Sequence, residues 1–247
     1  MILLLTGCIN PNGMVMTALS NQKEREAQYL NAINFYLTST NYPIVFTENS
    51  GTDISHHFGD AIESGRLECL TFQGNHDKKR GKGYGECEII EYALKNSIII
   101  HSSHDKRIAK ITGRLVVRNI TTIIRLHSFI LPKHTIICSY NSNLSFPDSR
   151  FIIASVDFFR TFINNKEAIN DSIGYYFEHA LSNTIKKDTK HIYSPFFIMP
   201  RIEGISGSTG KIYSIMPNSF AFTIRYVKHA IMLKIKFNKL TQDNDFT

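Results

Sequence analysis

Residues 81–86 read GKGYGE and open a helix whose apolar residues recur every three or four positions from Ile89 to Leu94. About one helix and one strand later, residues 108–114 read IAKITGR, an apolar strand that ends in polar residues. Glycines let the backbone come close to a diphosphate, and a helix N-terminus with an adjacent lysine offsets its charge. This order of glycine loop, helix and strand is typical of a nucleotide-sugar site.

Short apolar runs alternate with amphipathic segments through the first half of the chain. The predicted strands are residues 2–9, 44–47, 67–72 and 107–112, and the predicted helices between them are residues 20–37, residues 53–64 and the segment after the glycine loop. A β-α-β-α-β-α-β order over about 115 residues predicts a parallel, doubly wound α/β arrangement.

The second half is less regular. We expect a helix at residues 120–129, strands at residues 135–139 and 151–155, and a helix that begins at Asp171 or Ser172. Residues 221–237 mix apolar residues with arginine, lysine and histidine. Since no internal repeat or linker interrupts the chain, we predict one domain over residues 1–247.

The composition suits a folded protein with anionic partners. Of the 247 residues, 43% are hydrophobic, and the net charge of +7 favours nucleotide phosphates, nucleic acid or an anionic membrane surface, unless it serves solubility alone. Four widely spaced cysteines without a C-x-x-C pair argue against a zinc site or disulfide framework and suit a reducing cytoplasm. The apolar N-terminus lacks a basic segment, which indicates a buried strand rather than a signal peptide.

Small or polar residues follow all four predicted strands of the first half, at residues 6–8, 48–50, 73–75 and 112–114. Ligands of parallel α/β sheets bind beyond the carboxyl ends of the strands, so we expect one shared site. The candidate residues for binding a nucleotide-sugar donor are Thr6, Gly7, Cys8, Glu48, Asn49, Lys82, Gly83, Gly85, Glu86, Lys110 and Thr112.

With these motifs in this order, residues 1–115 resemble bacterial glycosyltransferases of GT-A type. In such enzymes a glycine-lysine segment opens a helix, as residues 81–83 do, and the next strand ends in a metal-binding Asp-x-Asp triplet. The combination of GKGYGE with KITGR looks like transferases of lipopolysaccharide, O-antigen and capsule clusters. The resemblance implies a GT-A-like (Rossmann-like), mostly parallel sheet flanked by helices.

The same resemblance implies a division of labour along the chain. Residues 1–115 would bind the nucleotide sugar, and the less regular residues 116–247 would bind a glycan or lipid-linked glycan acceptor. The enzyme would be cytoplasmic, and its basic C-terminal segment would either contact the inner-membrane surface or be a core element with solvated lysines.

The chain departs from the family pattern at the metal site. Its one Asp-x-Asp sequence is at residues 243–245, near the C-terminus, and residues 112–114 read Thr-Gly-Arg. An arginine repels a divalent cation. Arg114 and Lys110 can instead neutralise the leaving phosphate, so we expect metal-independent transfer, or a cytidine monophosphate donor, and no cofactor. The alternative for Arg114 is a structural ion pair.

A base is needed to take the proton of the acceptor hydroxyl. Glu178 and His179 are the first candidates, followed by Asp148 and then Asp157. The alternative for Glu178 is a salt bridge with a residue such as Lys186 or Arg201, and for His179 a packed or surface position. We also expect the Gly/Ser-rich loop at residues 204–210 to act as a lid or to be an ordinary surface loop.

Two more charged residues have open assignments. Glu86 either complements the helix dipole or binds a donor hydroxyl. Arg25 either is a solvated helix charge or reaches the loop after the first strand.

Two alternatives to an active transferase stay open. A basic module that binds nucleic acid has the right charge, but no nucleic-acid motif is present and the lysines are scattered. A catalytically inactive transferase relative is the other, because the acidic triplet is missing. Dinucleotide or ATP use is disfavoured, since neither a G-x-G-x-x-G sequence after the first strand nor a Walker loop occurs.

Overall fold

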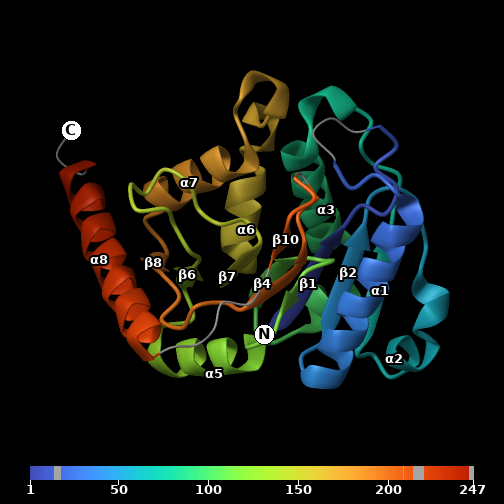
Figure 1. The fold of residues 1–247 in the computed structure, drawn as a ribbon, viewed down its shortest axis with the longest axis horizontal. Coiled ribbons are helices and arrows are strands. Elements are labelled where there is room, and N and C mark those ends of the chain that lie inside the picture. The colour runs from blue at the N-terminus through green and yellow to red at the C-terminus, as the bar shows by residue number, and fades with distance from the viewer. Residues whose placement is uncertain (14–17, 208, 214–219, 245–247) are drawn as a thin grey trace.

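The computed structural model describes residues 1–13, 18–207, 209–213 and 220–244, and a seven-stranded sheet forms its centre (Figure 1). The strand order is β3-β2-β1-β4-β7-β6-β8. The strands are β1 (Ile2–Gly7), β2 (Ile44–Glu48), β3 (Leu67–Thr71), β4 (Arg107–Thr112), β6 (Thr135–Ile137), β7 (Phe151–Ser155) and β8 (Ile192–Ser194).

The strands β1, β2, β3 and β4 are parallel to one another, which confirms the predicted α/β sheet. β7 pairs with β4 in the antiparallel direction and then with β6, which is parallel to β8. Strands from both halves of the sequence therefore lie in one mostly parallel sheet.

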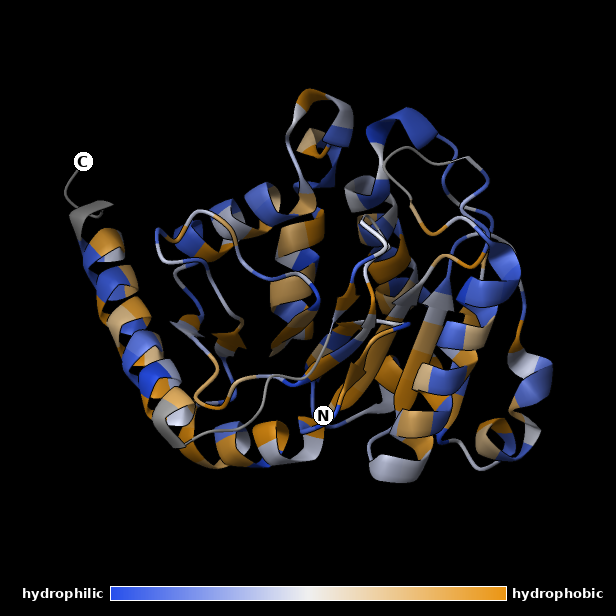
Figure 2. Cartoon of the chain, viewed as in Figure 1, coloured by the Kyte–Doolittle hydropathy of each residue, from blue (hydrophilic) through white to orange (hydrophobic). Residues whose placement is uncertain are grey.

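Alternating side chains along the strands send apolar residues to both faces of the sheet. In β1, Leu3 and Leu5 pack on one side with Tyr29 and Ile33, whereas Ile2 and Leu4 pack on the other. Figure 2 shows the strands as a mainly hydrophobic layer. Because both faces are apolar, helices have to cover both.

One face is covered by α1 (Gln22–Ser39), α2 (Gly59–Glu63) and α5 (Ile120–Ile130). The other is covered by α3 (Lys82–Asn96), α4 (Ile98–Ser102), α6 (Val156–Ile163) and α7 (Phe177–Lys187). A long helix, α8 (Phe220–Asn244), lies against the β8 end of the sheet through Leu233 and Phe237 (Figure 1). A small sheet of β5 (Val116–Val117), β9 (Ile202–Ile205) and β10 (Ile212–Tyr213) lies beside the main one.

Two helix starts differ from the sequence prediction. α1 begins at Gln22 because the Asn21 side chain accepts a hydrogen bond from Glu24 N at 3.2 Å. α7 begins at Phe177, and residues 171–173 form a separate short turn, η4 (Asp171–Ile173), that ends at Gly174 in the left-handed region. Among the described residues, none of the helices combines the length and apolarity needed to cross a bilayer.

Candidate active site

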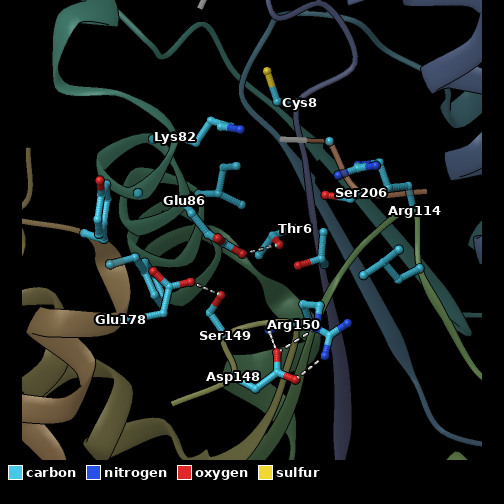
Figure 3. A pocket seen from close by; sticks show the side chains of 18 of the residues that line it. Thr6, Cys8, Lys82, Glu86, Arg114, Asp148, Ser149, Arg150, Glu178 and Ser206 are labelled. Atoms are coloured by element: carbon cyan, nitrogen blue, oxygen red, sulfur yellow. Dashed lines mark hydrogen bonds and ion pairs between the residues drawn. The ribbon is translucent and has the colours of Figure 1, made fainter. Parts of the chain in front are cut away.

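A cavity of about 930 Å³ opens at the carboxyl edge of the parallel strands (Figure 3). All four strand ends singled out from the sequence meet there. They contribute Thr6, Gly7, Cys8, Asn49, Asn75, Thr112 and Arg114. Because β7 runs in the opposite direction, it starts at this edge, and the segment before it adds Asp148, Ser149 and Arg150 to the lining.

Two cationic side chains extend into the cavity from opposite walls. Lys82 is the first residue of α3, and Arg114 follows β4 (Figure 3). Burial lowers the pKa of Lys82, against the pull of Asp171, and the nearby Arg114 charge lowers it further. Burial also lowers the pKa of Arg114, and the Arg25 charge adds to this. Cations that repel one another in a partly dry cleft create a strong attraction for an anion.

The Gly/Ser-rich loop lies beside Arg114. The Arg114 guanidinium donates to Ile205 O, and Gly207 O accepts from Ala18 N at 3.0 Å. Ser206, Gly207 and Thr209 line the cavity, while Ser208 is outside the described residues. The loop therefore has the position required of the predicted lid, and its closure over a ligand stays a prediction.

The loop after β1 is shaped by a buried arginine. Arg25 of α1 is only 6% exposed and donates to Cys8 O and Leu19 O, the first at 2.8 Å from Nε. Cys8 N in turn donates to the Tyr29 hydroxyl at 2.9 Å. Of the two assignments open for Arg25, the structure therefore supports the one in which it reaches the loop after the first strand. Burial raises the pKa of the Cys8 thiol to about 11, which keeps it neutral.

Glu48 lies beneath the cavity rather than in its lining. Its fully buried carboxylate accepts from Ile9 N at 2.9 Å, from Ser50 N at 2.8 Å and from Thr52 N at 3.0 Å. These bonds join the loops after β1 and β2. The carboxylate that was predicted to bind the donor thus accepts hydrogen bonds from the protein backbone instead. These buried N–H groups need an acceptor, and the carbonyls of the two loops do not supply it.

The start of α3 receives an anion from the protein itself. Gly81 has φ +86°, and the Asp171 carboxylate accepts from Gly83 N at 3.2 Å and from Lys82 N. A Cβ on Gly81 would collide with this carboxylate, and one on Gly85 would collide with Asn75. The glycines of the GKGYGE stretch therefore make room for two polar side chains of this chain, not only for a ligand.

A buried ion pair lies under the donor side of the cavity. Lys110 of β4 is completely buried and pairs with Glu86 of α3. The same carboxylate accepts from the Thr6 hydroxyl at 3.0 Å. Lys110 was predicted to meet the donor phosphate, but its position in the middle of a central strand directs it into the core instead. Glu86 remains 21% exposed and lines the cavity.

Glu178 faces the cavity from the first turn of α7. It accepts a hydrogen bond of 2.6 Å from the Ser149 hydroxyl (Figure 3). Burial raises its pKa, and the Ser149 bond only partly opposes this. A desolvated carboxylate with a raised pKa is suited to accept and return a proton.

The other base candidates have different surroundings. Asp148 is paired with Arg150, with Nε–Oδ1 and Nη2–Oδ2 distances of 2.8 and 2.6 Å. His179 does not line the cavity, and its Nδ1 accepts from Tyr176 N at 3.0 Å. Asp157 is 82% exposed and pairs with Arg160 on α6. Glu178 is therefore the candidate with both access to the cavity and a carboxylate without a cationic partner at bonding distance.

Aromatic rings form the wall next to Glu178. Phe146 is 37% exposed and meets Tyr176 edge to face, with centroids 6.4 Å apart. The Arg150 guanidinium lies 4.6 Å from the ring centroid of Tyr213. Ring faces and paired hydrogen-bonding groups suit a ligand that is apolar on one face and carries hydroxyls at its rim.

The expected absence of a resident divalent cation stays a prediction. Such an ion takes several oxygen ligands. At the end of β4 the chain offers Arg114, and across the described ranges no three His, Cys, Asp or Glu side chains come together as they would in a metal site built from protein ligands alone. The Asp-x-Asp sequence at residues 243–245 extends into residues that the structure does not describe.

Sequence reasoning missed most of the acceptor side. Asp171 was weighed only as a helix cap, and Ser149, Arg150, Phe146, Tyr176 and Tyr213 were not singled out as site residues. The motif Asp148-Ser149-Arg150 directly before a strand was the available signal. This motif was not decisive, because residues before a strand lie at the carboxyl edge of the parallel strands only if that strand is antiparallel to them.

No protein-family model and no curated protein matches this sequence. Among solved structures, the chain is similar to the galactosyltransferase LgtC in complex with donor and acceptor sugar analogues, at 10% identity over 78% of this chain and 73% of that one, with a TM-score of 0.46. It is also similar to a cytidylyltransferase from Leptospira borgpetersenii, at 10% identity, 79% and 75% coverage and a TM-score of 0.42.

A third similar structure is core-mannan synthase A from Aspergillus fumigatus in its Mn/GDP form, at 9% identity, 92% and 85% coverage and a TM-score of 0.39. At identities and scores this low, the activity of the chain has to be inferred from the cavity itself.

The raised pKa of Glu178 predicts a pH-dependent effect of Glu178→Gln on stability. A carboxyl group whose pKa is raised by folding contributes stability when the pH is below its ordinary pKa of 4.5. This contribution is lost as the pH rises through the pKa of the folded state. The Tm of the variant relative to that of the native protein should therefore rise as the pH increases from about 4 to about 8.

Thermal unfolding of both proteins across this pH range measures the difference. Glu63→Gln, at an exposed position of α2, is the matched control and should give a difference that does not vary with pH. A Tm difference for Glu178→Gln that is equally flat would contradict the raised pKa.

Proposed function

We propose that this chain is a glycosyltransferase that moves a sugar from a nucleotide-activated donor to a hydroxyl of a glycan, without a resident metal ion. The observation that carries the proposal is that one cavity has two cations on one side and a carboxyl group on the other. Lys82 and Arg114 face each other across its donor side, and the desolvated Glu178 faces its acceptor side.

The donor side suits a nucleoside phosphate. It lies at the carboxyl ends of β1 and β4, next to the loop that Arg25 and Glu48 hold, where parallel sheets bind nucleotides. A guanidinium grips phosphate oxygens in a bidentate manner, and the Lys82 ammonium adds a second positive charge. Since Asp171 already caps α3, these side chains are better placed than the helix N-terminus to offset the phosphate.

The reaction follows from this placement. The acceptor oxygen forms a bond with the anomeric carbon of the donor sugar while the bond from that carbon to the phosphate oxygen breaks. Glu178 takes the proton of the acceptor hydroxyl. Arg114 and Lys82 stabilise the negative charge that develops on the leaving phosphate, which is the role a metal ion has in many transferases.

The acceptor side suits a sugar ring. A pyranose has an apolar face that packs on aromatic rings such as Phe146 and Tyr176, and its hydroxyls can bond to the Asp148–Arg150 pair. Together with the motifs at residues 81–86 and 110–114, this supports a glycan of the lipopolysaccharide, O-antigen or capsule type as the acceptor.

We also propose that α8 rests on an anionic lipid surface. Ile224, Ile231 and Ile235 are 41–52% exposed and lie on one stripe of the helix, at successive spacings of seven and four residues. Arg225, Lys228 and Lys239 border this stripe and are exposed, and Figure 2 shows the alternation along the helix. An apolar stripe with a basic border binds anionic membranes, where a lipid-linked acceptor would be present.

Binding of nucleotides tests the donor side. We expect at least one pyrimidine or purine nucleotide to raise Tm, because a ligand at about 100 times its dissociation constant adds about 2.7 kcal/mol of stability. The shift should be the same with magnesium and with a chelator. It should be lost in Arg114→Ala and kept in Arg118→Ala, an exposed arginine that pairs with Glu203.

Two results would count against this. A shift that requires magnesium would contradict metal independence, and the absence of a shift with every nucleotide would contradict the nucleotide donor.

Loss of transfer in Glu178→Gln tests the acceptor side. Removal of the base should lower the rate of nucleotide release from the donor, measured with a panel of methyl glycosides as acceptors, by about 10²- to 10⁴-fold. The nucleotide-induced rise in Tm should remain, since Glu178 lies on the other side of the cavity. Native rates in the variant would exclude Glu178 as the base, and nucleotide binding without any transfer by the native protein would identify an inactive relative.

Flotation with vesicles tests the membrane surface. The double variant Ile231→Ser/Ile235→Ser should lose binding to vesicles that contain phosphatidylglycerol. Ile98→Ser, which changes a residue of α4 that is 74% exposed, should bind as the native protein does. Equal binding by the native protein to neutral phosphatidylcholine vesicles, or no loss in the double variant, would overturn this docking surface.

A further inference from the structure

One continuous chain of polar contacts joins the donor side of the cavity to its acceptor side. It begins where the Thr6 hydroxyl donates to Glu86, which pairs with Lys110. Lys110 Nζ donates to Ser149 O at 2.6 Å, and the Ser149 hydroxyl donates to Glu178 at 2.6 Å. The chain therefore links β1, α3, β4, the segment before β7, and α7.

Lys110 has no freedom to move within this chain. An ammonium group has three donor N–H bonds and is costly to bury unless they are used. One is directed at Glu86 and another at Ser149 O, while the Phe177 ring of α7 lies 5.4 Å from Nζ. With 0% exposure, the side chain has no water to replace a lost partner.

Ser149 takes part in this chain of contacts with both its backbone carbonyl and its side-chain hydroxyl. Its carbonyl accepts a hydrogen bond from Lys110 Nζ, and its hydroxyl donates to Glu178 (Figure 3). The neighbouring Arg150 O accepts from Thr112 N at 3.0 Å, so the backbone here is fixed to β4 on both sides. With the backbone fixed, the 2.6 Å hydrogen bond directs the serine hydroxyl at Glu178.

We propose that Ser149, fixed by Lys110, is the positioning residue of the acceptor side, whose hydroxyl orients the Glu178 carboxylate for proton transfer. The proposal rests on the proposed function for the role of Glu178 as the base. The network itself is a separate claim about the protein without substrate.

Three groups on other elements act on the Glu178 carboxylate. The Ser149 hydroxyl and the Lys110 charge favour its ionised form and lower its pKa, whereas the Glu86 charge and burial raise it. Removal of the hydroxyl from Ser149 should therefore raise the pKa of Glu178. A single hydrogen bond to a charged group predicts a rise of about 1 pH unit.

The test is an NMR titration of the full chain with ¹³C-labelled glutamate, with the Glu178 signal identified by its absence in Glu178→Gln. Ser149→Ala should raise the pKa of Glu178, and Ser149→Thr, which keeps a hydroxyl, should restore it. Ser145→Ala, at an exposed serine of the same loop, is the matched control and should leave it unchanged. The acidic limb of the pH profile of transfer should move with the titration.

An unchanged pKa in Ser149→Ala, or a rise of equal size in Ser145→Ala, would overturn the positioning role. A raised pKa with an unaltered pH profile would support the network and overturn the base assignment of the proposed function, so the two failures can be told apart.

Discussion

The buried ammonium group of Lys110 has to be neutralised, and the groups that do so hold the site together. Its pairing with Glu86 fixes α3 against β4, and its bond to Ser149 O fixes the start of β7. The Phe177 ring brings in α7. Because an uncompensated buried charge costs several kcal/mol, these elements cannot shift independently. The relative position of Glu86 and Glu178 follows from this one constraint.

Around this centre, the protein uses its own carboxylates where a ligand had been expected. Glu48 satisfies the backbone of two loops, and Asp171 satisfies the start of α3. Both tasks arise from orphan N–H groups that would otherwise be buried without partners. In the proposed function, the side chains of Lys82 and Arg114 therefore bind the phosphate instead of the N-terminus of α3.

Much of the structure of the first half was predictable, because its strands are identified by short segments of sequence. Apolar runs such as residues 2–5 and 108–111 identify buried strands, and their polar ends identify the edge where ligands bind. The positions of Thr6, Asn49, Thr112 and Arg114 in the cavity lining follow from that rule. Lys110 could not be placed in this way, since its neighbours in sequence do not reveal that Glu86 of α3 pairs with it.

By itself, the sequence determined the parallel α/β order of the first half, the edge of the sheet where the cavity opens, and the net positive charge of the protein, because hydrophobic period and charge are properties of short segments. Tertiary structure alone decided that β7 is antiparallel, which brings Asp148, Ser149 and Arg150 to the same edge as Thr112. It also decided that Asp171, 88 residues beyond Gly83, caps α3, and that Glu178 faces the cavity with the Ser149 hydroxyl bonded to it. These contacts join residues far apart in the chain, and their geometry is set by how whole elements pack.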